Sequence, residues 1–171
     1  MRLMAASAAS TAHPMGAEKK ETAGVIAPPP LIYVVGLIAG WLLERRWPAP
    51  FGLIEPAAQW VGWALIAAGL AIVAWAMVAL HRVRTSVNPY TPTAAIATTG
   101  PYRLSRNPIY VADFLIYLGV SALLNSPWPL LFLPLVVWVV NKGVIQREER
   151  YLEERFGNLY TVYQSRVRRW L

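Results

Sequence analysis

The sequence predicts an all-α polytopic membrane protein with about four transmembrane helices and a C-terminal amphipathic helical segment in the cytosol. Apolar residues make up 56% of the 171-residue chain and charged residues only 15%, which is too apolar for an ordinary soluble domain. The apolar residues fall in four runs, separated by charged or proline-rich loops. The eight Trp and eight Tyr residues are typical of belts at the two membrane–water interfaces.

The chain begins with a polar tail and a first predicted span. Residues 1–24 are rich in Ala, Ser and Thr without a continuous apolar core, which predicts a disordered tail rather than a secretory signal. Residues 25–171 then form one membrane domain. Its first span covers residues 25–43 and contains three prolines near its start, where a helix tolerates them. Gly36 and Gly40 form a GxxxG pair, which predicts close helix packing, either within the chain or between two copies.

Three further spans follow. Residues 59–80 form the second and strongest span, with 22 residues that carry no charge; a bilayer needs about 20. The third span covers residues 109–124 and the fourth residues 128–145, and these two form an antiparallel hairpin because their connection is too short to cross the bilayer. Residues 146–171 are predicted to form cytosolic helical structure, with Gly157 as the stop of its first helix.

The distribution of basic residues predicts the orientation. All of them except Arg45 and Arg46 lie in the tail, in the loop after the second span or in the C-terminal part. Four spans place both termini on the same side, and basic loops favour the cytoplasm. We therefore expect an integral membrane protein with cytoplasmic N- and C-termini. The net charge of +7 then reflects topology and contacts with membrane lipids, and we expect no nucleic-acid partner.

Several classes of site are excluded by composition. The chain has no Cys, which rules out disulfides, thiolate metal sites and Cys nucleophiles. His13 and His81 are the only histidines and are far apart in sequence, so we expect neither a metal site nor a Ser-His-Asp triad. No GxGxxG pattern follows a predicted strand, so no soluble nucleotide-binding fold is expected.

Two polar stretches on the cytosolic side are the strongest candidates for a functional site. Residues 100–110 form a basic loop that runs into the third span, and residues 148–160 follow the last apolar run. We expect the two stretches to fold onto each other at the membrane surface and enclose a small charged cofactor.

The carboxylates near these stretches allow more than one interpretation. Asp113 lies inside the third span, where a carboxylate is costly unless paired; it is either functional or held in a structural salt bridge, with Arg103 or Arg106 as the nearby cation. Glu148 and Glu149 are adjacent, so they diverge by about 100° on a helix and only one of them points easily into a pocket. Their run of alternating charges is also typical of a solvated helix face.

Taken together, the two stretches resemble the isoprenylcysteine carboxyl methyltransferase family, which is related to the phospholipid N-methyltransferases. The resemblance covers roughly residues 59–170. It is carried by the following residues: Gly100-Pro101-Tyr102, Arg106-Asn107-Pro108-Ile109-Tyr110, Glu148-Glu149, Leu152, Phe156-Gly157, Tyr160, Tyr163 and Arg166-Val167. Two positions depart from the family pattern: Asn107 stands where His is usual, and Arg168 where Pro is common.

The resemblance implies a membrane enzyme that uses S-adenosyl-L-methionine. It also implies which residues bind this cofactor: Ala94, Ala95, Ile96, Ala97, Tyr102, Arg106, Asn107, Pro108, Ile109, Tyr110 and Glu148. In this interpretation Glu148 holds the cationic parts of the cofactor and Arg106 its carboxylate. A carboxylate acceptor needs no general base, whereas an amine, thiol or hydroxyl acceptor would lose a proton to Glu148 or Asp113. Glu148, Arg106 and Asp113 are therefore the predicted catalytic residues.

The acceptor is expected to be a lipophilic molecule or lipidated substrate that enters from the bilayer. Composition does not separate an isoprenylcysteine carboxylate from a lipid amine, and it does not determine the oligomeric state. Two alternatives stay open: an NADPH-dependent, sterol-reductase-like oxidoreductase, which looks similar around the loop-to-helix motif, and an inactive membrane scaffold of the same fold.

Overall fold

A computed structural model describes residues 22–52, 55–88 and 90–171, and every regular element in these residues is helical. The elements are α1 (Pro29–Arg46), α2 (Glu55–Arg82), the 3-10 turn η1 (Gly100–Arg103), α3 (Pro108–Leu123), α4 (Trp128–Val140), the π-helical turn η2 (Asn141–Ile145), α5 (Gln146–Phe156) and α6 (Asn158–Arg166). The predicted all-α class is confirmed. The predicted tail, residues 1–24, lies almost entirely outside the described residues.

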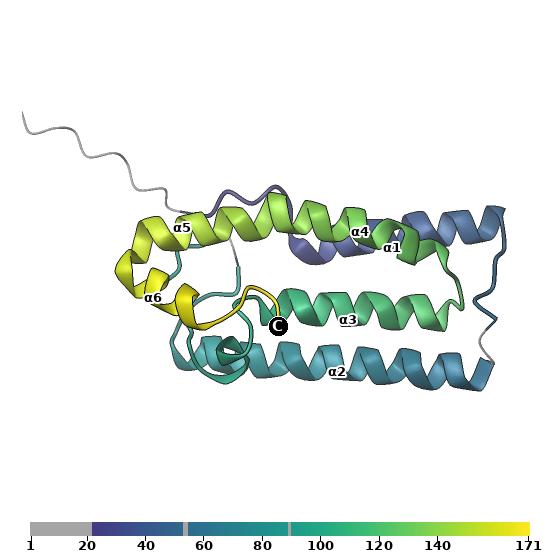
Figure 1. The fold of residues 1–171 in the computed structure, drawn as a ribbon, viewed down its shortest axis with the longest axis horizontal. Helices are drawn as coiled ribbons and strands as arrows, with labels where there is room; N and C mark the ends of the chain where they lie inside the picture. Colours follow the sequence, from purple (N-terminus) through teal and green to yellow (C-terminus); the bar gives the residue numbers. More distant parts are fainter. Residues whose placement is uncertain (1–21, 53–54, 89) are drawn as a thin grey trace, which may run out of the picture.

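The four long helices lie side by side in two pairs (Figure 1). Helix α3 packs along α2, and α4 packs along α1. Helices α3 and α4 run in opposite directions, as their short connection requires. The connections from α1 to α2 and from α3 to α4 lie at one end of the bundle, and α5, α6 and the loop after α2 gather at the other end.

The GxxxG pair of α1 is used inside the chain. A Cβ atom on Gly36 would collide with Val136 of α4 and approach Tyr117 of α3, and one on Gly40 would collide with the backbone of Pro129. The missing side chains therefore let α1 approach the α3–α4 hairpin closely. Of the two uses that the sequence allowed for this pair, packing within the chain is the one observed.

Helix α1 begins later than the first predicted span. Residues 25–27 were expected to belong to it, but the helix starts at Pro29, after Pro28 in an extended conformation. The reason is local: a proline disfavours helical backbone at the residue before it. Residues 22–28 instead run as an irregular segment, and this segment returns below as part of the pocket wall.

Two helical stretches among the described residues are long and apolar enough to cross a membrane. They are Glu55–Arg82, with a mean hydropathy of 2.3, and Trp128–Phe156, with 1.7, while α3 is apolar but shorter. The second stretch is one continuous helix made of α4, η2 and α5. Seven of the eleven residues of α5 are charged, so the apolar part of this stretch ends at Ile145.

Candidate functional site

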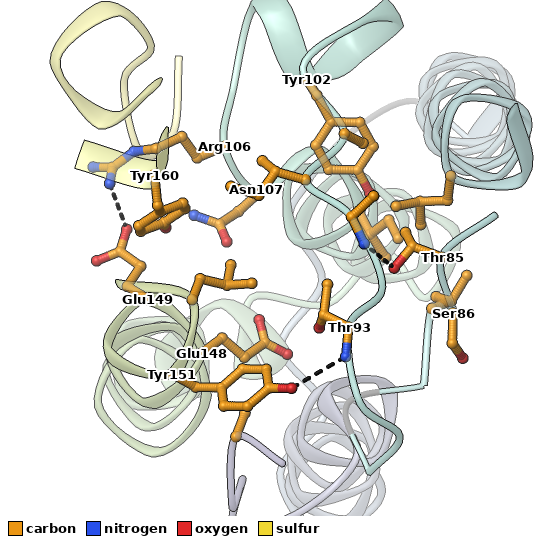
Figure 2. Close-up of a pocket in the computed structure, with 18 of the residues that line it drawn as sticks. Thr85, Ser86, Thr93, Tyr102, Arg106, Asn107, Glu148, Glu149, Tyr151 and Tyr160 are labelled. Carbon is orange, nitrogen blue, oxygen red and sulfur yellow. Dashed lines mark hydrogen bonds and ion pairs between the residues drawn. The ribbon is translucent and has the colours of Figure 1, made fainter. Parts of the chain in front are cut away.

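A pocket opens where α5, α6 and two loops meet at one end of the bundle (Figure 2). The cavity has a volume of about 150 Å³ and is partly open to solvent. Its wall includes residues from the loop after α2, from the loop before α3, from the first turn of α3 and from both C-terminal helices. The two polar stretches singled out in the sequence are therefore both present in one pocket.

The loop after α2 is held in place by hydroxyl groups. The Thr85 hydroxyl oxygen accepts hydrogen bonds from the backbone N–H groups of Ala94, at 3.1 Å, and Ala95, at 3.5 Å. The backbone N–H of Thr93 donates to the Tyr151 hydroxyl at 3.1 Å, which ties the loop to α5 across the pocket (Figure 2). These contacts bring the backbone of residues 95–97 to the pocket wall.

The loop before α3 turns sharply at Gly100. This residue has φ of +62°, and its Cα lies against Trp75 and Ala79 of α2, so glycine satisfies both the backbone angle and the close approach. The 3-10 turn η1 follows, and Pro108 then starts α3, where the missing N–H of proline costs nothing. The turn thus leads Arg106 and Asn107 to the mouth of the pocket.

Among the residues that the structure describes, Glu148 is one of two acidic residues that line the pocket. The Tyr110 hydroxyl, from the first turn of α3, lies 2.8 Å from each Glu148 carboxylate oxygen and donates its hydrogen bond to that carboxylate. Burial raises the pKa of Glu148 to about 7; the Tyr110 hydrogen bond lowers it and the neighbouring Glu149 raises it. Glu148 therefore changes between its neutral and its charged form near neutral pH.

Glu149 is not the solvated residue that the alternating charges favoured. It is 8% exposed, and its carboxylate pairs with Arg106 at 3.0 Å and with Arg169 at 3.0 and 2.6 Å. Glu149 is four residues after Ile145 and three before Leu152, so it lies on the apolar face of the helix. The two cations compensate the burial of its carboxylate. The cluster of Arg106, Glu149 and Arg169 carries one net positive charge.

The C-terminal residues form an extended strand-like segment along the loop before α3. The backbone N–H of Arg106 donates to the carbonyl oxygen of Arg168 at 2.9 Å. The carbonyl oxygen of Arg169 accepts from the Ser105 hydroxyl at 3.2 Å and from the Asn107 side-chain amide at 3.0 Å. Asn107 therefore holds this segment through its side-chain NH₂ group, and Arg168 accepts its hydrogen bond through its backbone carbonyl oxygen.

Aromatic side chains close the α6 side of the pocket. The Tyr163 hydroxyl donates to the carbonyl oxygen of Tyr102 at 2.7 Å, and Tyr160 is almost fully buried beside it. Burial raises the pKa of Tyr160 to about 12 and raises the pKa of Tyr102 and Tyr163 as well. These phenols stay neutral at physiological pH, where they supply apolar surface and hydrogen-bond donors.

Most of the predicted site residues line this pocket. They are Ala95, Ile96, Ala97, Tyr102, Arg106, Asn107, Pro108, Ile109, Tyr110 and Glu148. Two predicted residues are not part of the lining. Ala94 is exposed, and Asp113 lies in the second turn of α3, after the lining residue Tyr110.

The predicted salt bridge of Asp113 is also not formed with Arg106. Arg106 pairs with Glu149 instead, and no ion pair of Arg103 occurs among the described residues. One carboxylate oxygen of Asp113 is buried without a hydrogen-bond partner. A single sequence does not reveal this, because helical spacing gives the face of Asp113 and not the direction of the arginine side chains.

Several lining residues were not assigned to the site from the sequence. They are Ala23, Leu80, Thr85, Ser86, Val87, Asn88, Thr93, Glu149, Tyr151, Leu152, Tyr160 and Tyr163. Leu152, Tyr160 and Tyr163 belonged to the motif that carried the family resemblance, which was the available signal for them. The hydroxyl-bearing loop after α2 gave no such signal, since Ser and Thr are common in any turn.

The arrangement fits a small molecule that carries both a positive and a negative group. Glu148 supplies a carboxylate for a cation. Arg106 supplies positive charge to the pocket wall: its guanidinium pairs with Glu149, and its buried Nε atom has no hydrogen-bond partner. Ala95, Ile96 and Leu152 add apolar surface. Among the described residues, no group of three His, Cys, Asp or Glu side chains is placed to hold a metal ion.

Comparison with known proteins gives matches to methyltransferases. The sequence model of the family described as phospholipid methyltransferase matches residues 57–159. An uncharacterised protein of Haemophilus influenzae is 38% identical over 63 residues, which are 37% of this chain and 100% of that protein. A protein-S-isoprenylcysteine O-methyltransferase of Schizosaccharomyces pombe is 36% identical over 72 residues, which are 42% of this chain and only 30% of that enzyme. No solved structure gives a significant match.

Proposed function

The chain belongs to the phospholipid methyltransferase family, and from this premise we propose that it is an integral membrane methyltransferase that uses S-adenosyl-L-methionine and acts on a lipophilic acceptor. The observation that carries the proposal is that Glu148 and Arg106, which come from the two signature stretches, line the same pocket. Family membership and the two apolar helices both indicate a membrane protein.

The residues present match the chemical groups of the proposed cofactor. Glu148 would balance its cationic sulfonium and amino groups, and the unpartnered Nε of Arg106 would bind its carboxylate. The apolar surface of Ala95, Ile96 and Leu152 suits its adenine ring. When bound, the cofactor supplies an electrophilic methyl group, which the lone pair of an acceptor takes up as the carbon–sulfur bond breaks.

The protein's own contribution to catalysis is positioning and exclusion of water. Tyr110 orients the Glu148 carboxylate through its hydrogen bond, and the C-terminal segment keeps Arg106 and Asn107 at the pocket. Such fixed geometry supplies much of the rate enhancement in a displacement reaction that needs no covalent intermediate. For an amine acceptor, Glu148 with its pKa of about 7 is poised to receive the proton.

We propose a topology of four spans with the pocket on the cytosolic side. The basic residues of the loop after α2 and of the C-terminal part lie at the pocket end, which the positive-inside rule assigns to the cytoplasm. Because the chain has no Cys, single cysteines report the orientation without background. Ser165→Cys is expected to react with an impermeant maleimide only after the membrane is permeabilised. Glu55→Cys, at the start of α2, is expected to react while the membrane is intact.

The acceptor is proposed to be an isoprenylcysteine-like carboxylate or a lipid amine that reaches the pocket from the bilayer. Purified protein is incubated with methyl-labelled S-adenosyl-L-methionine and, separately, with a prenylated cysteine analogue and an aminophospholipid. We expect label in one of these acceptors and at least a tenfold lower rate in Glu148→Gln. Glu44→Gln, at the opposite end of the bundle, is the matched control. Equal rates in wild type and Glu148→Gln would remove Glu148 from the site.

A further inference from the structure

The irregular segment before α1, residues 23–26, forms part of the pocket wall. Ala23 lines the pocket, and Val25 is 7% exposed in the apolar core beside Tyr110 and Ile145. The segment therefore belongs to the site, although the sequence placed residues 23 and 24 in a disordered tail. We call residues 23–26 the strap.

The strap is docked on the π-helical turn η2. The backbone N–H of Ile26 donates to the carbonyl oxygen of Gly143 at 3.3 Å. A π-turn takes up one more residue than an α-turn and is often found at functional sites. Gly143 also leaves room for the strap, because a Cβ atom there would collide with the Ile26 side chain.

A second docking point lies one helical turn further along. The Arg147 guanidinium donates to the carbonyl oxygen of Gly24 at 2.8 Å. Residues 143 and 147 are four apart, so they lie on one helix face, and Glu148 follows directly. The strap is thus attached to the same part of the helix that places the Glu148 carboxylate in the pocket.

Two segments near the chain ends, the strap and the C-terminal segment, contact residues that line the pocket, and they are held with unequal strength. The C-terminal segment is fixed by three hydrogen bonds to residues 105–107 and by the ion pairs of Arg169 with Glu149. The strap is fixed by two hydrogen bonds, one of them from an exposed arginine. Both segments also add apolar contacts to the core, Val25 from the strap and Trp170 from the C-terminal segment. Local opening occurs where the fewest contacts are broken, so of these two segments the strap, which has fewer hydrogen bonds and no ion pair, opens at the lower cost.

We infer that the strap is the gate of the pocket: it lifts from Gly143 and Arg147 to exchange the small molecule and closes again over the Glu148 end. This inference rests on the proposed function, because the molecule exchanged is S-adenosyl-L-methionine or its demethylated product. Gly143 and Arg147 are positioning residues in this account, since they hold the gate and do not line the pocket.

A disulfide tests the gate directly. The ideal Cβ position of Gly143 lies 2.7 Å from Cγ1 of Ile26. The Ile26 Cβ is bonded to that Cγ1 and lies one bond length further away, so the two Cβ positions are about 4 Å apart, which matches a disulfide. The variant Ile26→Cys with Gly143→Cys is loaded with labelled S-adenosyl-L-methionine, oxidised, and checked for the bond by mass spectrometry. We expect release of the label to slow at least tenfold and to recover on reduction. Ile26→Cys alone, oxidised in the same way, is the control.

A milder variant covers the case in which the double cysteine protein does not fold. Arg147→Gln removes one docking point on an exposed side chain, and we expect label release several times faster than in wild type. Arg150→Gln, also exposed on α5, is expected to leave it unchanged. Unchanged release in both the confirmed disulfide and Arg147→Gln would overturn the gate while the proposed function stands. Absence of S-adenosyl-L-methionine binding in wild type would overturn both.

Discussion

The two ends of the helical bundle each contain a glutamate that links separate helices, but the two carboxylates are used differently. At the end where the short connections lie, Glu44 of α1 accepts hydrogen bonds from the Ser126 hydroxyl at 2.6 Å and from the backbone N–H of Ala49 at 3.3 Å. At the other end, Glu148 accepts a hydrogen bond from Tyr110 and opens into the pocket. Glu44 joins three parts of the chain, while Glu148 keeps capacity for a ligand.

The difference shows how a structural polar cluster is distinguished from a binding site. A buried polar group that only stabilises the fold is normally satisfied by its neighbours, as the buried Ser126 is by the partly buried Glu44. The pocket end instead combines a carboxylate with a raised pKa, the unpartnered Nε of Arg106 and an open cavity. Those three features together favour a ligand, whereas each alone has structural explanations.

The largest effect is expected from Glu149, which belongs to the pocket end but acts structurally. Glu149→Ala leaves Arg106 and Arg169 close together without their shared carboxylate, and loss of one member of a buried ion cluster typically costs about 3–5 kcal/mol. Thermal unfolding in detergent should show a large drop in Tm. Glu153→Ala, on the exposed face of the same helix, is the control and should unfold like wild type; similar Tm values for both would contradict the cluster's role.

Removing Glu44 should weaken the opposite end without touching the ligand. Glu44→Ala deprives the Ser126 hydroxyl and the Ala49 N–H of their acceptor, and hydrogen bonds to charged groups contribute about 1.5–3 kcal/mol. We expect a lower Tm and an unchanged Kd for S-adenosyl-L-methionine, measured by calorimetry on the folded fraction. A weakened Kd would show that the two ends are coupled and that their comparison is too simple.

The pH dependence sharpens the contrast at Glu148. The pKa of its carboxyl is about 7 in the ligand-free chain, and only the ionised form balances a cation. Affinity for S-adenosyl-L-methionine should therefore be constant above pH 7 and fall by up to about tenfold per pH unit below it. Glu148→Gln should remove this dependence. A profile that is the same in both proteins would assign the titration to another group.

The smallest effect is expected from Asp113. Since this residue does not line the pocket, Asp113→Asn should leave the Kd for S-adenosyl-L-methionine within about twofold of wild type. Loss of a carboxylate that has one buried oxygen without a hydrogen-bond partner should not lower Tm. Methyl transfer measured on the same preparation tests the catalytic role predicted from the sequence. An unchanged Kd with lost transfer would keep Asp113 as a proton acceptor, and a weakened Kd would place it in the cofactor site.

Much of the fold followed from local rules that one sequence states directly. The uncharged run in α2, the proline start of α3 and the stop of α5 at Gly157, with φ of +53°, are set by residues within a turn of each boundary. The juxtaposition of the two signature stretches was expected because both lie on the cytosolic side of the predicted spans, and the family resemblance supported it. Spacing alone gave no reason to bring residues 100–110 against residues 148–160.

The parts that were not predicted depend on contacts between distant segments. The pairing of Glu149 with Arg106 and Arg169 joins three segments, and a pattern of alternating charges on one helix does not show it. The strap lies on η2 through backbone atoms, which carry no sequence signal. Asn107, which departs from the family pattern, makes its observed contact with a distant segment, because its side-chain amide donates to the carbonyl oxygen of Arg169.

The most direct test of the account is the affinity of purified protein for S-adenosyl-L-methionine in wild type and in Glu148→Gln, with NADPH as the competing cofactor. We predict that wild type binds S-adenosyl-L-methionine and not NADPH, and that Glu148→Gln weakens this binding by about 10- to 100-fold, the value of one charge-assisted contact. Equal affinity in the two proteins, or a preference for NADPH, would contradict the assignment of the pocket.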